Sequence, residues 1–296
     1  MKPISAPSHS GNEVLDRASA LYEALLGRAI DDGARNAIAA QRADETDAGF
    51  ALAVQLLYSA EFMERLVDRA IEAHLFLIHR ARQIMVRRLL PSAGAILDLG
   101  GINAPLFRIG YAHSFRRMVI VDLPPDERHL AYRDIRFDAP EGCGEVTIHY
   151  GDMTSLGHFA DSTFDLVWSG QSIEHVEPQA ASRMCSEALR VLRPGGHFCL
   201  DTPNRAITTI HTREIGGGFV HPDHKYEYRA SELRELLRGF GFEIEMERGI
   251  CEMPKTVQTG RFHYEDFALG NPIANNAEDG YILFFRCRKP EVVRSQ

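Results

Sequence analysis

From Ser92 onward, short apolar runs alternate with helical stretches, and this alternation narrows the choice of fold more than any other feature. Most of the runs are continuously apolar, which is typical of strands buried on both faces of a parallel sheet. The helical stretches, clearest over 177–192 and 230–238, indicate a doubly wound α/β arrangement. The predicted strands are 95–99, 118–122, 146–150, 164–168, 197–201, 242–247 and 281–287.

Residues 1–90 follow a different pattern, with apolar side chains at helical spacing and few β-branched residues. The first twelve residues hold Pro, Ser and Gly, which predicts a flexible tail. Ser59 is a typical N-cap for a long helix that carries Phe62, Leu66 and Phe76. We therefore predict a tail over 1–12, an all-α domain over 13–75 and an α/β domain over 76–290.

Composition and charge exclude several classes of protein. The formal net charge of −8 gives no electrostatic footprint for nucleic acid, and we interpret the Arg-rich stretch 80–88 as the solvated face of a helix. The five cysteines form no CxxC pair, so neither a disulfide framework nor a cysteine-based zinc site is predicted. The first residues lack the apolar stretch of a signal peptide, and no run reaches the roughly 18 apolar residues of a membrane span. We therefore predict a cytoplasmic protein without nucleic-acid or membrane partners.

The strongest local signal is the segment 95–106, in which an apolar strand carries Asp98 and then turns sharply on Gly100 and Gly101. In an open α/β sheet, ligands bind at the carboxyl ends of strands, near the point where the strand order reverses. Glycines at such a turn let the backbone approach a ligand closely. Because a glycine pair also occurs in ordinary tight turns, the interpretation depends on the motifs that follow.

Acidic residues follow the next two predicted strands. Asp122 ends the second strand about twenty residues further on, where a carboxylate can accept hydrogen bonds from both hydroxyls of a ribose. Asp152 comes just after the third strand, so parallel strands would place it at the same edge of the sheet. Two more motifs follow in order, 164–176 (FDLVWSGQSIEHV) and 188–198 (ALRVLRPGGHF).

This ordered series of motifs resembles the class I S-adenosylmethionine-dependent methyltransferases, over about residues 80–288. The resemblance implies a Rossmann-like, mostly parallel sheet of seven strands in which the last strand is antiparallel. It also implies methyl transfer as the activity and S-adenosyl-L-methionine as the cofactor.

The resemblance further assigns contacts to the cofactor. Its methionine portion would lie against Gly100 and Gly101, its ribose against Asp122, and its adenine against Asp152 with Met153. The remaining predicted cofactor-binding residues are Asp98, which would support the loop and the amino end of the cofactor, Leu123, and the pair Ser169 and Gln171, which would line the pocket beside the reactive methyl group.

One departure from the family pattern concerns the glycine loop. The usual pattern is Gly-x-Gly-x-Gly, whereas Ile102 and Ala104 stand at the later glycine positions. A side chain at Ile102 can crowd the cofactor, and we expect Gly101 to take over with a shifted loop path. A nicotinamide-binding fold would instead need Gly-x-Gly-x-x-Gly, which 100–105 do not supply.

Methyl transfer to an oxygen atom benefits from a general base, and histidine titrates near neutral pH. The candidate catalytic residues are His175, near the end of the fourth strand, and His221 and His224 in 203–229, which we interpret as a substrate loop. The structural alternatives are that His175 caps the following helix and that the other two brace the loop. Although His221, Asp223 and His224 are metal-ligand types, a hard cation prefers clustered carboxylates, so no metal site is predicted.

The N-terminal helical region resembles a small domain of unknown function that is related to phycobilisome linkers. The resemblance rests on 21–33 (LYEALLGRAIDDG) and 56–62 (LLYSAEF), and it covers about 14–66. That domain accompanies bacterial enzymes of surface-glycan assembly, and it would serve docking or homo-oligomerisation, or act as a plain helical cap. We therefore expect O-methylation of a sugar or surface-glycan intermediate. The alternatives are N- or C-methylation of a small metabolite, and a scaffold that keeps the fold without turnover.

Overall fold

The computed structural model describes residues 28–40, 70–128, 144–213 and 216–291, together with isolated residues of the N-terminal region. The chain forms two compact units, Met1–Leu75 and Phe76–Gln296. Helix α2 (Asp32–Ala40) lies in the first unit, where a small apolar cluster includes the buried Tyr22 and Leu56. The predicted N-cap Ser59 falls outside the described residues. The all-α character of this region and the predicted domain bounds stay predictions.

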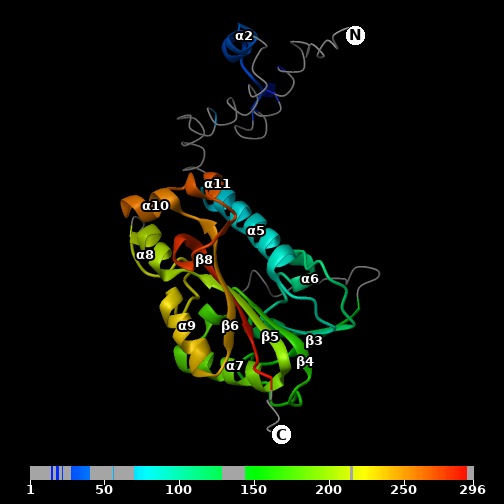
Figure 1. The fold of residues 1–296 in the computed structure, drawn as a ribbon. Helices are drawn as coiled ribbons and strands as arrows, with labels where there is room; N and C mark the ends of the chain where they lie inside the picture. Colours follow the sequence, from blue (N-terminus) through cyan, green and yellow to red (C-terminus); the bar gives the residue numbers. More distant parts are fainter. Residues whose placement is uncertain are drawn as a thin grey trace, which may run out of the picture. The chain divides into compact units, whose positions relative to one another are not determined.

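The second unit is built around one sheet of eight strands in the order β3-β2-β1-β4-β5-β8-β6-β7 (Figure 1). Strands β1 to β5 pair in parallel, and β8 runs antiparallel between β5 and β6. The strand order reverses between β1 and β4, and a reversal of this kind opens a crevice at the carboxyl ends of the strands. The strands are β1 (Ala95–Leu99), β2 (Arg117–Asp122), β3 (Glu145–Tyr150), β4 (Phe164–Gly170), β5 (Leu192–Pro203), β6 (Glu243–Glu252), β7 (Ile273–Ala274) and β8 (Gly280–Arg288).

The predicted α/β fold with a mostly parallel sheet is confirmed. The predicted count of seven strands is wrong, because a short additional strand, β7, pairs antiparallel with β6 at the edge of the sheet. Two residues are too few to produce a periodic or continuously apolar signal, so this strand cannot be recognised from the sequence.

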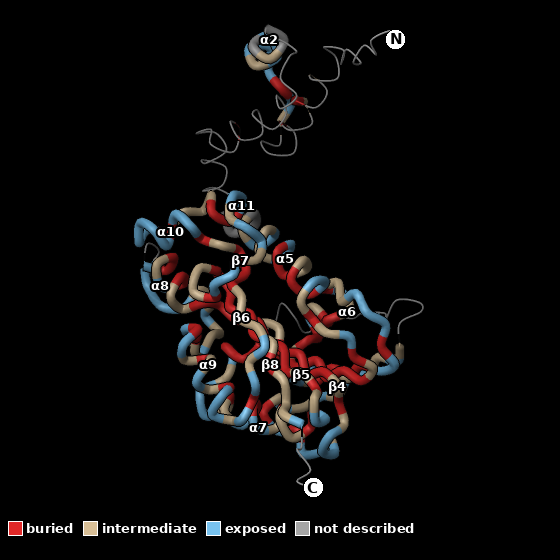
Figure 2. The backbone as a smooth tube through the Cα atoms, viewed as in Figure 1, coloured by how far each residue is buried: buried red, intermediate tan, exposed pale blue. Residues whose placement is uncertain are grey.

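Helices cover both faces of the sheet and create two apolar cores (Figures 1 and 2). Side chains of α7 and α9 pack with Leu97 and Leu99 in one core, while side chains of α5 and α6 pack with Ile96 in the other. Successive residues of β1 therefore enter opposite cores, as the pleat of a strand requires. The helices are α5 (Ala70–Leu89), α6 (Leu106–Ile109), α7 (Pro178–Val191), α8 (Arg205–Arg213), α9 (Ala230–Gly239), α10 (Pro254–Thr259) and α11 (Asp266–Leu269), with short 3₁₀ turns η1 (Pro125–Glu127), η3 (Ile173–His175) and η4 (Ala277–Asp279).

Three expectations about the chain's polar and irregular stretches need revision. The predicted substrate loop 203–229 contains α8, and the stretch between the predicted strands 242–247 and 281–287 contains α10 and α11. These helices are too short to give a clear helical period, which is why the sequence did not show them. In the stretch 80–88, Arg82 is buried and only part of the helix face is solvated.

Within the described part of the chain, no helix combines the length and apolar character that crossing a bilayer requires.

Candidate functional site

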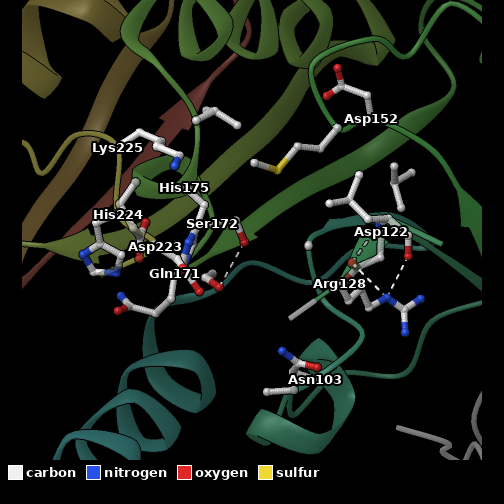
Figure 3. Close-up of a pocket in the computed structure, with 18 of the residues that line it drawn as sticks. Asn103, Asp122, Arg128, Asp152, Gln171, Ser172, His175, Asp223, His224 and Lys225 are labelled. Atoms are coloured by element: carbon white, nitrogen blue, oxygen red, sulfur yellow. Dashed lines mark hydrogen bonds and ion pairs between the residues drawn. The ribbon is translucent and has the colours of Figure 1, made fainter. Parts of the chain in front are cut away.

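A cavity of about 770 Å³ opens at the carboxyl ends of the central parallel strands. Its lining residues follow β1, β2, β3 and β4 in turn, and the segment 221–225 closes the opposite side. Figure 3 shows Asp122 and Asp152 on one side of this cavity, with His175 and His224 on the other. The cavity thus occupies the crevice that the reversal of strand order creates.

The turn after β1 has room only for glycine at two successive positions. Gly100 has a φ of +73°, and a Cβ atom there would lie 2.6 Å from the Ser172 hydroxyl oxygen. A Cβ on Gly101 would lie 2.3 Å from the carboxylate of Asp98. The side chain of Ile102 is 2% exposed and packs in the core that contains α5 and α6, so it does not crowd the cavity.

Asp122 presents a carboxylate that is fixed by the neighbouring backbone. The N–H groups of Ile102 and Leu123 donate to its two oxygens at 3.0 and 2.8 Å, and the Arg128 Nε lies 3.7 Å away. Burial raises the pKa of Asp122, whereas these N–H donors and Arg128 favour its charged form. Because a carboxylate oxygen can accept more than one hydrogen bond, Asp122 keeps acceptor capacity toward the cavity that it lines.

Asp152 and Met153 line the cavity next to Asp122. The Asp152 carboxylate accepts hydrogen bonds from the backbone N–H and the hydroxyl of Thr154, at 2.7 and 2.8 Å. These local bonds hold the turn after β3, while the Asp152 side chain itself is exposed. Its acid group therefore borders the cavity but is more strongly solvated than that of Asp122.

The structure divides the predicted cofactor-binding residues into two groups. Six of them line the cavity, and they are Gly100, Asp122, Leu123, Asp152, Met153 and Gln171. The other three, Asp98, Gly101 and Ser169, are absent from the lining, and both Asp98 and Ser169 are fully buried. Within the described part of the chain, Asp98 Oδ1 and the Ser169 hydroxyl have no hydrogen-bond partner. These two groups therefore lie behind the wall of the cavity.

The pKa of Asp98, a fully buried carboxyl group on β1, is shifted strongly from its usual value. Its Oδ2 accepts a hydrogen bond from the N–H of Leu106 at 2.8 Å, yet burial, together with the nearby Asp122, raises its pKa to about 7. The protonated acid is therefore favoured in the folded protein. Its contribution to stability is present at low pH and is lost as the pH rises through about 7.

We expect the Asp98→Asn variant to remove this dependence on pH, because asparagine keeps an acceptor oxygen but cannot ionise. The free energy of unfolding of the variant, relative to the parent protein, should rise by about 3 kcal/mol from pH 5 to pH 8, since each pH unit between pH 5 and the folded pKa of about 7 contributes about 1.4 kcal/mol. Urea unfolding at both pH values measures this difference. An unchanged difference would show that Asp98 is already ionised at pH 5 in the folded state.

Three histidines meet at the other end of the cavity. The ring centroid of His175 lies 4.9 Å from that of His224 and 6.1 Å from that of His221. His224 Nδ1 lies 2.7 Å from Glu227 Oε1, and this carboxylate also accepts the N–H of Val220 at 2.9 Å. Although His175 is open to the cavity, the crowding of its ring by protein atoms, together with its two histidine neighbours, lowers its pKa to about 4.

The structural alternatives for these histidines have different outcomes. The N-cap position of α7 is Glu177, so His175 does not cap that helix. His224 does brace its loop through Glu227, as the alternative for this residue supposed. His221 and His224 both line the cavity, so bracing and a role in chemistry coexist in this segment.

Sequence reasoning missed two charged residues of the site. Glu174 precedes His175, is 1% exposed, and accepts a hydrogen bond from the Thr202 hydroxyl at 2.8 Å. Burial raises the pKa of Glu174 to about 7. Arg82 also lines the cavity, and its Nε and Nη2 donate to the fully buried Asp201 at 2.5 and 3.1 Å. The adjacency to His175 could have revealed Glu174, but no local signal connects Arg82 to Asp201.

Comparisons of sequence show which known proteins this domain resembles. Residues 97–200 match the family described as "Methyltransferase domain". A protein of Mycolicibacterium smegmatis named "probable S-adenosylmethionine-dependent methyltransferase" is 37% identical over 131 residues, which cover 44% of this chain and 46% of that protein. The 27-O-demethylrifamycin SV methyltransferase of Amycolatopsis mediterranei is 28% identical over 154 residues, which cover 49% of this chain and 54% of that protein. The chain spans about half the length of these curated relatives.

Comparison of structures establishes the fold. An S-adenosylmethionine-dependent methyltransferase of Thermotoga maritima, described as a possible histamine N-methyltransferase, superposes with a TM-score of 0.51 at 20% identity. The match covers 76% of this chain and 97% of that chain. At this identity the likeness concerns the fold alone. Residues 97–200 are therefore similar to methyltransferase domains, and the second unit has a Rossmann-like fold that superposes on that of an S-adenosylmethionine-dependent methyltransferase.

Proposed function

We propose that the chain is an S-adenosylmethionine-dependent methyltransferase that acts on a hydroxyl group of a sugar or surface-glycan intermediate. The observation that carries this proposal is a single cavity with a fixed carboxylate, Asp122, at one end and three histidines at the other. Its volume of about 770 Å³ is typical of small-molecule sites and leaves space for an acceptor beside the cofactor.

The cofactor would bind across the strand ends. Asp122 would accept hydrogen bonds from the ribose hydroxyls, and Met153 with Asp152 would border the adenine. The backbone at Gly100, where no side chain intervenes, would approach the methionine portion. Gln171, which has a φ of +56° and lines the cavity, would lie beside the methyl group. This assignment directs the methyl group toward the histidines.

Methyl transfer on this site would be an in-line displacement. The acceptor oxygen attacks the methyl carbon, a C–O bond forms as the C–S bond breaks, and the bonding electron pair remains on sulfur as a neutral thioether. The acceptor's proton passes to a histidine of the cluster formed by His175, His221 and His224. The protein contributes mainly by holding the two reactants in line, because the cofactor supplies the electrophile.

Labelled methyl transfer to a panel of acceptors tests the proposed function. We expect label from S-adenosylmethionine to appear on sugars or nucleotide sugars as an ether. If label is transferred only to amines or carbon acids, O-methylation is wrong and the alternative, N- or C-methylation of a small metabolite, takes its place. If the cofactor binds weakly or not at all and no acceptor is labelled, the scaffold alternative holds.

The His175→Ala variant tests the chemistry at the histidine end. Because a positioned proton acceptor or acceptor-binding group contributes about 10²–10⁴-fold, turnover should fall by that range while cofactor affinity stays within about twofold. The matched control is His263→Ala, since His263 does not line the cavity. Full activity in His175→Ala would remove this residue from the mechanism.

The region 13–75 would serve docking or homo-oligomerisation within this proposal, on the basis of its resemblance alone. A cytoplasmic location likewise stays a prediction. Neither is needed for the assignment of the cavity, which rests on the described residues of the second unit.

A further inference from the structure

Glu174, His175 and His224 bring three metal-ligand atoms together at one end of the cavity. One ligand atom from each lies within 4.8 Å of the other two. Glu174 and His175 are neighbours in η3, whereas His224 comes from the segment after α8. The backbone N–H of Lys225 donates to the carbonyl oxygen of Glu174 at 2.7 Å, which fixes the two segments against each other.

The carboxylate of Glu174 is only half satisfied by the protein. Its Oε2 accepts from the Thr202 hydroxyl, but its Oε1 is buried and has no hydrogen-bond partner among the described residues. A buried acidic oxygen without a partner is unfavourable, and native proteins usually supply a donor or an ion. The unpartnered Glu174 Oε1 is a second feature, separate from the spacing of the histidines, that points to a ligand. A positively charged ligand at the same place would supply the partner that this oxygen lacks.

His224 is oriented as a metal-binding histidine. Its Nδ1 lies 2.7 Å from Glu227 Oε1, and Glu227 Oε2 accepts from the Thr208 hydroxyl at 2.5 Å. With Glu227 1% exposed, this pair is held in a fixed geometry. A carboxylate that accepts the Nδ1 proton leaves Nε2 as the nitrogen with the free lone pair, which is the usual support for a metal-bound imidazole.

We propose that Glu174, His175 and His224 bind a divalent transition-metal ion. One carboxylate and two imidazoles suit Zn²⁺, Mn²⁺ or Fe²⁺, whereas Mg²⁺ and Ca²⁺ prefer all-oxygen ligands. Three protein ligands leave open positions on the cavity side for an oxygen of the acceptor. No metal site is predicted from the sequence, where the candidate ligands are His221, Asp223 and His224. Of these three residues, only His224 is among the ligands proposed here.

The role of the ion rests on the proposed function. A hydroxyl bound to a divalent ion has a lowered pKa, so the acceptor would lose its proton more readily. His221 lines the cavity but stands outside the ligand set, and it would take that proton. The oxygen then attacks the methyl carbon as the C–S bond breaks. On this account His175 and His224 position the acceptor through the ion, and His221 is the base.

Mn²⁺ titration of the full-length protein tests the site directly. The protein is first stripped with a chelator, and free Mn²⁺ is followed by electron paramagnetic resonance. We expect a single site per chain that Zn²⁺ displaces. His175→Ala should weaken Mn²⁺ affinity by about 10–100-fold or more, and Glu227→Gln by about 10–100-fold. The matched control for affinity is His221→Ala, which removes a neighbouring histidine that is not one of the three proposed metal ligands and should change Mn²⁺ affinity by less than about twofold.

His175 is exposed, so its replacement tests the cluster without disturbing the buried core. Absence of a stoichiometric Mn²⁺ site, or equal affinity in the parent protein and His175→Ala, would overturn the metal proposal. Glu174→Gln offers a second test, because it keeps the side-chain volume and removes the charge. Calorimetry with S-adenosylmethionine on the stripped protein separates the two proposals. Cofactor binding without Mn²⁺ binding defeats only the metal site, and Mn²⁺ binding without cofactor binding defeats only the proposed function.

Discussion

Replacing Asp122 by alanine is expected to weaken S-adenosylmethionine binding by about two to four orders of magnitude. Two ribose hydroxyls would donate to this carboxylate, and hydrogen bonds to a charged group contribute about 1.5–3 kcal/mol each. In the variant, the N–H groups of Ile102 and Leu123 also lose the carboxylate to which they donate hydrogen bonds in the parent protein. The turn after β1 would therefore lose part of its support. Isothermal titration calorimetry measures the change in affinity.

The matched control is Asp126→Ala. Asp126 lies in η1, close to Asp122 in the chain, but it is exposed and does not line the cavity. The Asp126→Ala variant removes the same charge as Asp122→Ala, so it shows any effect of net charge alone. We expect it to change the affinity for S-adenosylmethionine by less than about twofold. If both variants bind the cofactor like the parent protein, Asp122 does not contact the ribose, and the assignment of the cavity fails.

Arg82→Met is expected to lower the free energy of unfolding by about 3–5 kcal/mol, which is the cost of breaking a buried ion pair by removing one partner. Arg82 makes two hydrogen bonds to Asp201, whose side chain is 0% exposed, so the variant leaves an uncompensated buried charge. For a domain of this size, about 2–4 °C per kcal/mol corresponds to a fall in Tm of about 10 °C.

The control for Arg82→Met is Arg80→Met on the same helix. Arg80 is exposed, so its replacement should change the Tm by no more than about 1 °C. The double variant Arg82→Met with Asp201→Asn should recover much of the loss, because it removes the buried charge with its partner. Equal melting temperatures for Arg82→Met and Arg80→Met would show that the ion pair is not formed in solution.

Sequence patterns predicted the sheet and the rim of the site because both depend on short-range order. Short, mostly apolar runs marked β1 to β5, and parallel strands bring their carboxyl ends to one edge. Asp122 and Asp152 therefore had to fall near each other, as the cavity lining shows. The same reasoning placed His175 at this edge, because it follows β4 within a few residues.

What the sequence could not predict depends on the direction of side chains and on distant partners. Asp98 sits on a strand whose pleat sends alternate residues to opposite faces, so its carboxylate lies beneath the turn and not in the cavity. Arg82 and Asp201 are 119 residues apart. Glu174 could not be assigned to a site from the sequence, because His224 comes close to it only in the folded chain.

A crystal structure of the protein with S-adenosylhomocysteine would show whether this cavity binds the cofactor. We expect both ribose hydroxyls to lie within hydrogen-bonding distance of the Asp122 carboxylate and the sulfur to face the end of the cavity where His175 and His224 meet. A nucleoside bound elsewhere, or one in this cavity with its sulfur turned away from the histidines, would contradict this expectation.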